Sequence, residues 1–406
     1  MNFKASVGST LVGLYLFSVP AFSYSEDLGL NKIPQILGVL VVVYALFNLL
    51  QVPLISKNRS VLFYFLFTLW SITTYAFAFF QSETGSLVTL LKVATITGGS
   101  AVLIKDGSDF RRTISIFFFS IFLTFLINRN DIMNLSQMDE ITDNDRFEGT
   151  FANANTAALY CLGIIWVGFT LLLTGNFPKI LRPVIIAGIL LSVVIVIYSG
   201  SNKGLLGMGF FSAAVAWIMI QRYRFTRFKK FIFALIVLGG TALIVNFIVT
   251  SPFFFRVQTM FTGENESSVT RVFLFSEAIK VWSSSLKNIL IGIGFDNFRF
   301  YNQLRDYSHS TITETLACTG LIGFVLYFSS FLCLFLTYLR SFNKQISGLK
   351  TTVILVFSFL CLILFFNSAA VMLDDRLFWP LLGVISAYGV FLGKQDEYGK
   401  LLLPLH

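Results

Sequence analysis

Four side chains at the edges of apolar segments, Arg146, Lys203, Arg271 and His309, could do chemistry. An imidazole can exchange a proton near neutral pH or donate a hydrogen bond to an anion, and three cations could hold an anionic ligand. Each also has a simpler interpretation, because a histidine at a helix start is often a structural polar group and a lysine near lipid can extend to the membrane surface. The choice depends on the elements that position the four residues.

The composition is that of a membrane protein. Of 406 residues, 55% are hydrophobic and 13% are charged, with a mean hydropathy of +0.77, whereas a soluble domain carries roughly 25% charged residues. Runs of about 20 mainly apolar residues, the length that spans a bilayer, predict twelve spans. They lie at about 5–22, 33–55, 61–80, 84–104, 112–128, 151–174, 183–199, 204–221, 231–250, 312–338, 351–373 and 377–393. The sequence therefore predicts an all-α, polytopic integral membrane protein with one membrane domain over residues 1–406.

The basic residues predict which side each loop faces. More than half of the 30 Lys and Arg residues fall in one set of short alternate loops. The positive-inside rule assigns these loops to the cytoplasm together with both termini. We interpret the densest cluster, "RYRFTRFKK" at 222–230, as a topology anchor that contacts anionic membrane lipid and not as a nucleic-acid site. The first apolar run lacks a good small-residue cleavage site, so an uncleaved first helix is expected.

Two loops on the opposite, external side are long, at about 129–150 and about 251–311. The second loop carries basic residues although the positive-inside rule disfavours them on this side, so their presence needs an explanation other than topology. Within it, helical spacing of apolar residues over 271–288 predicts an amphipathic helix that begins at Arg271 and lies at the membrane surface. The apolar residues are Phe275, Ala278, Ile279, Trp282 and Leu286. A plain packing helix with a solvated arginine is the alternative. The glycines at 292 and 294 then allow a sharp turn or a close approach of the backbone.

Other polar stretches on this side also stand at helix ends. The stretch "NDRFEGTFANANTAALY" puts Arg146 and Asn155 at the start of the sixth predicted span, and "YSGSNKGLLG" puts Lys203 in a turn that nearly lies within the membrane. Ionisable groups at such depth are costly and usually face a cavity or an anionic partner. Because Arg146, Lys203 and Arg271 share one side of the membrane with His309, an anionic ligand there would explain the three cations together.

Four stretches in order carry a family resemblance: "RFEGTFANANTAALY", "SGSNKGLLG", "TRVFLFSEAIKVWSSSLKNILIGIGFDNF" and "SHSTITETLACTGLIGFVLYF". Together they resemble the O-antigen polymerase and O-antigen ligase superfamily of bacterial envelope enzymes. They span roughly residues 146 to 326, and the rest of the chain is similar only as hydrophobic helices. Two positions depart from the family pattern. Lys203 stands where many members carry arginine, so a bidentate hydrogen-bonding contact with phosphate is replaced by the contact of a single point charge. Ser310 follows His309 at a position where asparagine is common.

The resemblance implies a glycosyltransferase whose donor is a glycan linked through pyrophosphate to a polyprenyl lipid, at the outer face of the bacterial inner membrane. On that basis Arg271, Lys203 and Arg146 are expected to clamp the donor pyrophosphate, where fixed cations stabilise the charge that develops as the sugar leaves. His309 is expected to take the proton of the acceptor hydroxyl or to orient the acceptor. Supporting roles are expected for Asn155, Tyr307 and Arg376.

No metal and no cofactor are expected, because pyrophosphate is already a good leaving group. The carboxylate pairs at 143–145 and 374–375 could instead hold a divalent cation through oxygen ligands, although solvated loop acids are the simpler interpretation. Asp374 and Asp375 could also pair with Arg376 close to the site. The partners implied by the resemblance are the lipid-linked donor, a glycan acceptor, membrane lipid and a regulator of chain length.

Two enzyme reactions remain open at this stage. A polymerase joins lipid-linked repeat units to one another, whereas a ligase moves a finished polymer to a lipid A core or another acceptor. The "RFEG" to "NAN" stretch looks more like the polymerases, which favours that reaction. A transporter or lipid-glycan flippase is the alternative from another class, but its usual related halves and charged midplane helices are not evident, since Lys92 alone is charged in mid-helix.

Overall fold

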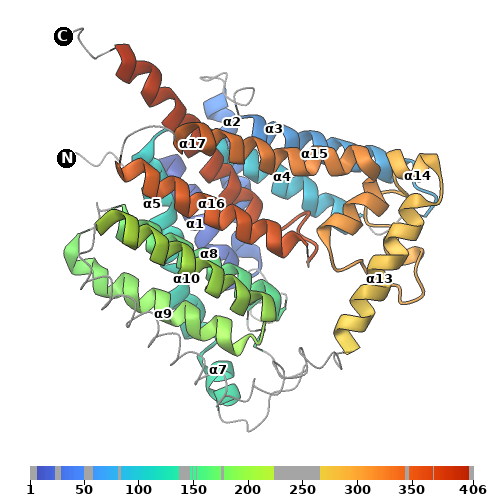
Figure 1. Ribbon diagram of the computed structural model, residues 1–406, viewed down its shortest axis with the longest axis horizontal. Helices are drawn as coiled ribbons and strands as arrows, with labels where there is room; N and C mark the ends of the chain where they lie inside the picture. The colour runs from blue at the N-terminus through green and yellow to red at the C-terminus, as the bar shows by residue number, and fades with distance from the viewer. Residues whose placement is uncertain are drawn as a thin grey trace.

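The computed structural model describes residues 7–22, 29–49, 58–80, 84–136, 147–148, 150–151, 153–174, 178–223, 266–342, 347–368 and 370–401. The regular elements in these ranges are all helices (Figure 1). The α-helices are α1 (Val7–Phe22), α2 (Lys32–Leu49), α3 (Arg59–Ala76), α4 (Gly85–Leu103), α5 (Gly107–Phe118), α6 (Ser120–Ile127), α7 (Arg129–Ser136), α8 (Ala154–Leu173), α9 (Arg182–Tyr198), α10 (Asn202–Tyr223), α13 (Glu266–Ser283), α14 (Leu286–Leu290), α15 (Thr311–Phe342), α16 (Ser347–Asn367) and α17 (Phe378–Leu401). The all-α prediction is confirmed for the described part of the chain.

The helices coincide with the predicted spans. Each predicted span contains a helix except 231–250, which lies outside the described residues. In the described part, six helical segments are long and apolar enough to cross a membrane, and four shorter apolar helices accompany them. These helices support an integral membrane protein, while the number twelve stays a prediction. The predicted span 112–128 is divided at Phe119 into α5 and α6, and α7 follows where an irregular loop was expected.

Aromatic contacts and hydrogen bonds to backbone carbonyls join the helices. Tyr64 of α3 stacks on Trp379 of α17 with ring centroids 3.5 Å apart, and its hydroxyl donates to the carbonyl of Leu373 at 2.9 Å. Trp166 of α8 donates Nε1–H to the carbonyl of Leu355 in α16 at 3.0 Å. In lipid, helices associate through such packing and hydrogen bonds more than through exclusion of water. These contacts therefore join α3 to α17 and the middle of α8 to the middle of α16.

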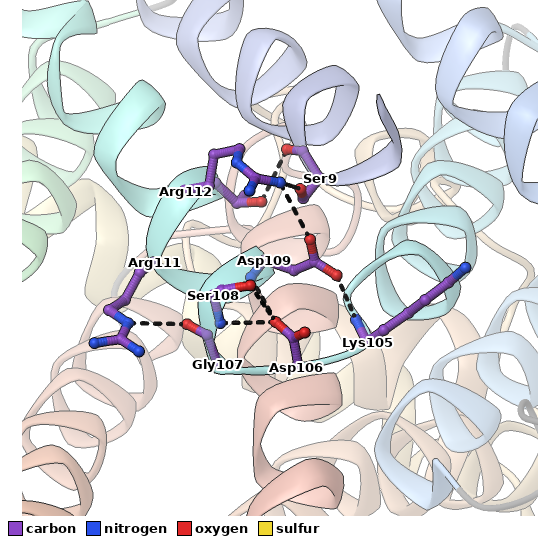
Figure 2. A network of polar contacts seen from close by, with 9 residues as sticks. Ser9, Lys105, Asp106, Gly107, Ser108, Asp109, Arg111 and Arg112 are labelled. Atoms are coloured by element: carbon purple, nitrogen blue, oxygen red, sulfur yellow. Dashed lines mark hydrogen bonds and ion pairs between the residues drawn. The ribbon is translucent and has the colours of Figure 1, made fainter. Parts of the chain in front are cut away.

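Figure 2 shows a polar network that fixes the start of α5 against α1. The Asp106 carboxylate caps α5 by accepting the backbone N–H groups of Ser108 at 2.7 Å and Asp109 at 2.9 Å. Arg112 donates to Ser9 Oγ of α1 at 2.8 Å and to the Asp109 carboxylate at 3.4 Å. Because unpaired polar groups are costly in lipid, these paired contacts favour one arrangement of the two helices.

The predicted amphipathic helix is present with different bounds. Helix α13 begins at Glu266, so Arg271 is not at its start as predicted, because the polar first turn carries no apolar periodicity. Leu274 and Ala278 are fully buried, whereas Phe275 is 48% exposed and Leu286 is 73% exposed. Of the predicted apolar residues, Ala278 packs inside the protein, whereas Phe275 and Leu286, the latter in α14, stay exposed, and the position of this face at the membrane surface stays a prediction. Packing against the start of α15 selects the buried side, and that contact is invisible in periodicity alone.

The predicted glycine turn is confirmed and attaches this segment to α15. Gly292 and Gly294 have φ of 82° and 107°. Backbone N–H groups of Ile293 and Gly294 donate to the carbonyls of Ala317 and Cys318 at 3.0 and 2.9 Å. Helix α15 is kinked here, since Gly320 has φ of 66° and a Cβ on it would overlap the Leu290 carbonyl. The close backbone contact brings α13 and α14 onto the start of α15, at the right-hand end of the bundle in Figure 1.

Candidate functional site

A cavity of about 250 Å³ lies where the helix ends and loops of the predicted external side meet. Its walls come from the starts of α4, α8 and α10, from α13, and from the segments 295–299, 307–314 and 366–375. Seven of the residues singled out in the sequence line it. They are Asn155, Lys203, Arg271, Tyr307, His309, Asp374 and Asp375. Segments far apart in the sequence, predicted as separate external polar stretches, thus surround one space.

His309 stands in a turn immediately before α15. Its backbone is left-handed, with φ of 57°, a conformation that histidine adopts more readily than most residues. Its Nε2 lies 3.1 Å from the Asp306 carboxylate, and its ring centroid lies 4.3 Å from that of Tyr307. The Glu314 carboxylate supports the turn by accepting the Ser308 backbone N–H at 2.7 Å. The imidazole is therefore held by local hydrogen bonds at the cavity wall.

The electrostatics of the cavity favour the neutral imidazole. Burial lowers the pKa of His309 below its usual range, and the cations Arg271 and Lys203 lower this pKa further. The Asp306 carboxylate acts in the opposite direction but does not reverse the shift. An imidazole that is neutral at physiological pH has a free lone pair and can accept a proton.

The two cations reach the cavity from different elements. Lys203 stands in the first turn of α10, directly after the tight turn at Gly200, and Arg271 lies on α13. Asn155, near the start of α8, accepts a hydrogen bond from Ser201 at 2.8 Å and so ties α8 to the turn before Lys203. Cations held by helices beside a neutral imidazole can bind an anion while a proton is removed nearby.

Four carboxylates also line the cavity, of which only Asp374 and Asp375 were expected close to the site from the sequence. They are Asp296, Glu314, Asp374 and Asp375. Asp296 has a left-handed backbone, with φ of 59°, and pairs with Arg299, a third lining cation. Glu314 is only 3% exposed. The cavity therefore carries both signs of charge, a combination that can bind sugar hydroxyls as well as an anion.

The interpretation of Asp374 and Asp375 as solvated loop acids is wrong. Both are partly buried in the cavity wall, and Asp375 caps α17 by accepting the backbone N–H groups of Leu377 and Phe378 at 2.9 and 2.8 Å. Burial raises the pKa of each carboxyl to about 6, and hydrogen bonds lower that of Asp375 only in part. The alternative expectation, that these acids lie close to the site, is confirmed by their position in the cavity wall, whereas their ion pairing with Arg376 stays a prediction.

The remaining residues predicted for the site do not line the cavity or lie outside the described part of the chain. Arg376 borders a second, polar pocket that shares part of its lining with the cavity. Arg146 and the carboxylate pair at 143–145 lie outside the described residues. Among the residues that the structure does describe, no group of three or more His, Cys, Asp or Glu side chains is arranged to hold a metal ion.

Comparison with known families matches residues 186–328 to the family model described as O-antigen ligase. The match supports the similarity of this stretch to the O-antigen polymerase and ligase superfamily. The O-antigen ligase segment contains Lys203, Arg271 and His309, whereas Asn155, Asp374 and Asp375 reach the same cavity from outside it. No curated protein matches the chain. The resemblance found in the sequence is thus confirmed at the level of the superfamily, whose members are glycosyltransferase-like enzymes.

Proposed function

We propose that the protein polymerises lipid-linked oligosaccharide repeat units. It transfers glycan from a polyprenyl-pyrophosphate donor to a sugar hydroxyl of an acceptor, at the outer face of the cytoplasmic membrane and without a metal or cofactor. The observation that carries this proposal is the shared cavity, in which Lys203, Arg271 and His309 meet from three separate elements of the O-antigen ligase segment.

Arg271 and Lys203 are assigned to the donor pyrophosphate. As the bond between the anomeric carbon and the pyrophosphate oxygen breaks, the electron pair stays with the pyrophosphate. Fixed cations in a site of low dielectric stabilise this charge more strongly than water does. Arg271 supplies a planar fork suited to phosphate oxygens, and Lys203 supplies a compact charge. The leaving group then departs without needing a proton, so the cations alone serve this half of the reaction.

His309 is assigned to the acceptor. The acceptor oxygen forms the new glycosidic bond, and its proton passes to the imidazole. If Nε2–H donates to Asp306, at the 3.1 Å separation between Nε2 and the carboxylate, Nδ1 carries the lone pair that receives the proton. The lowered pKa of His309 keeps that lone pair available at neutral pH. Asn155, Tyr307 and the lining carboxylates are assigned to sugar hydroxyls and to the positioning of the acceptor.

The ligase reaction is a second candidate, because the matching family model is described as O-antigen ligase. It uses the same donor and the same cations, and differs in the acceptor, which would be a lipid A core or another non-polyprenyl molecule. Both candidates therefore make the same demands on Lys203, Arg271 and His309. The acceptor that binds in the cavity distinguishes the polymerase reaction from the ligase reaction.

The experiment that tests this function is the glycan profile on a gel after the gene is deleted and restored as wild type, Arg271→Ala or His309→Asn. A polymerase predicts that deletion removes the ladder of chain lengths while a single repeat unit still reaches its final acceptor, and that neither variant restores the ladder. If full-length polymer forms but stays on its lipid carrier, the protein is a ligase. If the profile is unchanged by deletion, the proposal is wrong.

A further inference from the structure

A second, mainly apolar groove of about 380 Å³ lies between α2 and α4 beside α1. Aliphatic side chains form its body, among them Val39, Val43 and Ile96. Two cations border it: Lys92, which is exposed in the span formed by α4, and Arg376 in the loop before α17. An apolar groove with cations at its border suits an amphiphile with an apolar chain and an anionic head.

The groove continues into the candidate site. Between them lies the polar pocket, of about 440 Å³, that Arg376 borders. Thr89 and Arg376 line both the groove and this pocket, while Asn153, Asp374 and other residues line both the pocket and the His309 cavity. The three spaces therefore follow one another from the lipid-facing side of α2 and α4 to His309.

Each space has a different chemistry. The groove offers aliphatic surface and positive charge at its border. The pocket offers hydroxyl, amide, carboxylate and guanidinium groups, from residues such as Thr89, Asn153, Arg299 and Asp374, which is the mixture that sugar hydroxyls need. The cavity offers the imidazole of His309. An extended molecule with an apolar chain, an anionic group, a sugar and a reactive hydroxyl would match this order.

Building on the proposed function, we propose that the groove between α2 and α4 binds the polyprenyl pyrophosphate carrier of the acceptor repeat unit. The donor pyrophosphate is assigned to Lys203 and Arg271 in the cavity, whereas Lys92 and Arg376 line the groove and only Arg376 also lines the polar pocket. Cations in the groove as well as in the cavity suit two pyrophosphates better than one. The acceptor sugar then occupies the polar pocket and presents its hydroxyl to His309.

This arrangement favours the polymerase reaction over the ligase reaction. A ligase acceptor carries no polyprenyl pyrophosphate, so it has no use for a second carrier site. The simplest competing occupant is bulk membrane lipid, which covers any apolar surface of a spanning helix. Charge complementarity and continuity with the cavity favour a specific pyrophosphate lipid, and a binding stoichiometry separates the two occupants.

The test is native mass spectrometry of the full chain in detergent, with polyprenyl pyrophosphate as the probe and phosphatidylglycerol as the competitor. Val43→Trp fills the groove from a side chain that is 43% exposed, so the fold has room for the ring. Leu40→Trp is the matched control, because Leu40 is 45% exposed on the same helix and does not line the groove. Arg271→Gln weakens the donor site, and Arg376→Gln weakens the groove.

The wild-type protein and Leu40→Trp are expected to bind two probe molecules that phosphatidylglycerol does not displace. Val43→Trp and Arg271→Gln should each bind one, and the double variant none. Arg376→Gln should weaken the groove site by about ten- to a hundredfold, the effect of losing one charged hydrogen bond. The inference is overturned by Val43→Trp that binds as many probe molecules as the wild-type protein, or by displacement of the groove-bound probe with phosphatidylglycerol.

Failure of the proposed function gives a different result. In that case the groove binds its probe molecule and Val43→Trp removes it, but no glycan is transferred in reconstituted vesicles and Arg271→Gln changes nothing. If the protein binds one molecule that either Val43→Trp or Arg271→Gln removes, the groove holds the chain of the donor, and the assignment to the acceptor is wrong.

Discussion

The Nε2 atom of His309 lies 3.1 Å from a carboxylate oxygen of Asp306, three residues earlier in the same turn. This pair resembles the histidine and carboxylate of a general base, in which the acid fixes the ring and the tautomer. The balance of charges differs from a simple ion pair, however. Burial, Arg271 and Lys203 together outweigh Asp306, so the pKa of His309 is lowered and the ring is neutral at physiological pH.

Replacing Asp306 with asparagine should move the pH dependence of glycan transfer. Asp306 raises the pKa of His309, so Asp306→Asn should lower it further, and the acid limb of the rate profile should shift to lower pH. At neutral pH the rate should fall only modestly, since the ring stays neutral and loses only its orienting partner. The measurement is the initial transfer rate in reconstituted vesicles between pH 4.5 and 8. A shift of the limb to higher pH would contradict the role given to Asp306.

Asp374→Asn should stabilise the protein at neutral and alkaline pH. The pKa of Asp374 in the fold is about 6, above its ordinary value of 3.8, mainly because of burial. Ionisation therefore costs stability as the pH rises from about 4 to 6, and this cost persists above pH 6. Asparagine does not ionise, so the variant avoids this cost in stability, which is at most about 3 kcal/mol for a pKa shift of this size. The midpoint of thermal unfolding should rise at pH 8, and the gain should disappear near pH 4. A gain that is equal at both pH values would exclude ionisation as its cause.

The sequence predicted the helices well because apolar runs of membrane length need no tertiary information. It also predicted that Lys203, Arg271 and His309 share one side, because topology follows from the distribution of basic residues. It did not reveal Asp296 or Glu314, and it placed Asp374 and Asp375 close to the site without revealing their burial. Their positions depend on the turn at 292–294 packing against the kink at Gly320 and on the loop between α16 and α17.

Some of the missed features left a signal in the sequence. Thr311 and Glu314 have the spacing of a helix-capping pair, which could have marked Glu314 as a residue that supports the His309 turn. Likewise, Asp375 precedes α17 as a capping residue would. The buried face of α13 left none, since the exposed Phe275 fits the same helical spacing as the buried Ala278. Only the contact with α15 shows that Leu274 and Ala278 face inward.

The two cations should respond differently to conservative substitution. Arg271→Gln should lower the rate of transfer about a hundred- to a thousandfold, comparable to the loss of one preorganised charge-stabilising group. Arg271→Lys should recover only part of this loss, because lysine lacks the planar fork. Lys203→Arg, in contrast, should retain most of the activity, since many members of the superfamily carry arginine there. Rates at saturating donor measure these effects, and a Lys203→Gln variant as active as wild type would remove Lys203 from the site.

The kink at Gly320 should be intolerant of any side chain. Gly320 has φ of 66°, and a Cβ would overlap the Leu290 carbonyl. Gly320→Ala should therefore cost at least about 1–3 kcal/mol of unfolding free energy and separate α14 from α15. Gly209→Ala in α10 is the control, because no atom lies within 4 Å of the added Cβ, and alanine favours a helix by about 1 kcal/mol. Equal unfolding midpoints for the two variants would show that the kink carries no strain.

The most direct test of the central claim is glycan transfer by the purified protein in vesicles, with a labelled repeat unit on polyprenyl pyrophosphate as the substrate. His309→Asn is the decisive variant, since asparagine also accepts the left-handed backbone at this position but cannot take up a proton. Wild-type protein should produce a ladder and release polyprenyl pyrophosphate, and His309→Asn should reduce the rate by about a hundredfold or more. A His309→Asn protein that builds the ladder at the wild-type rate would contradict the account.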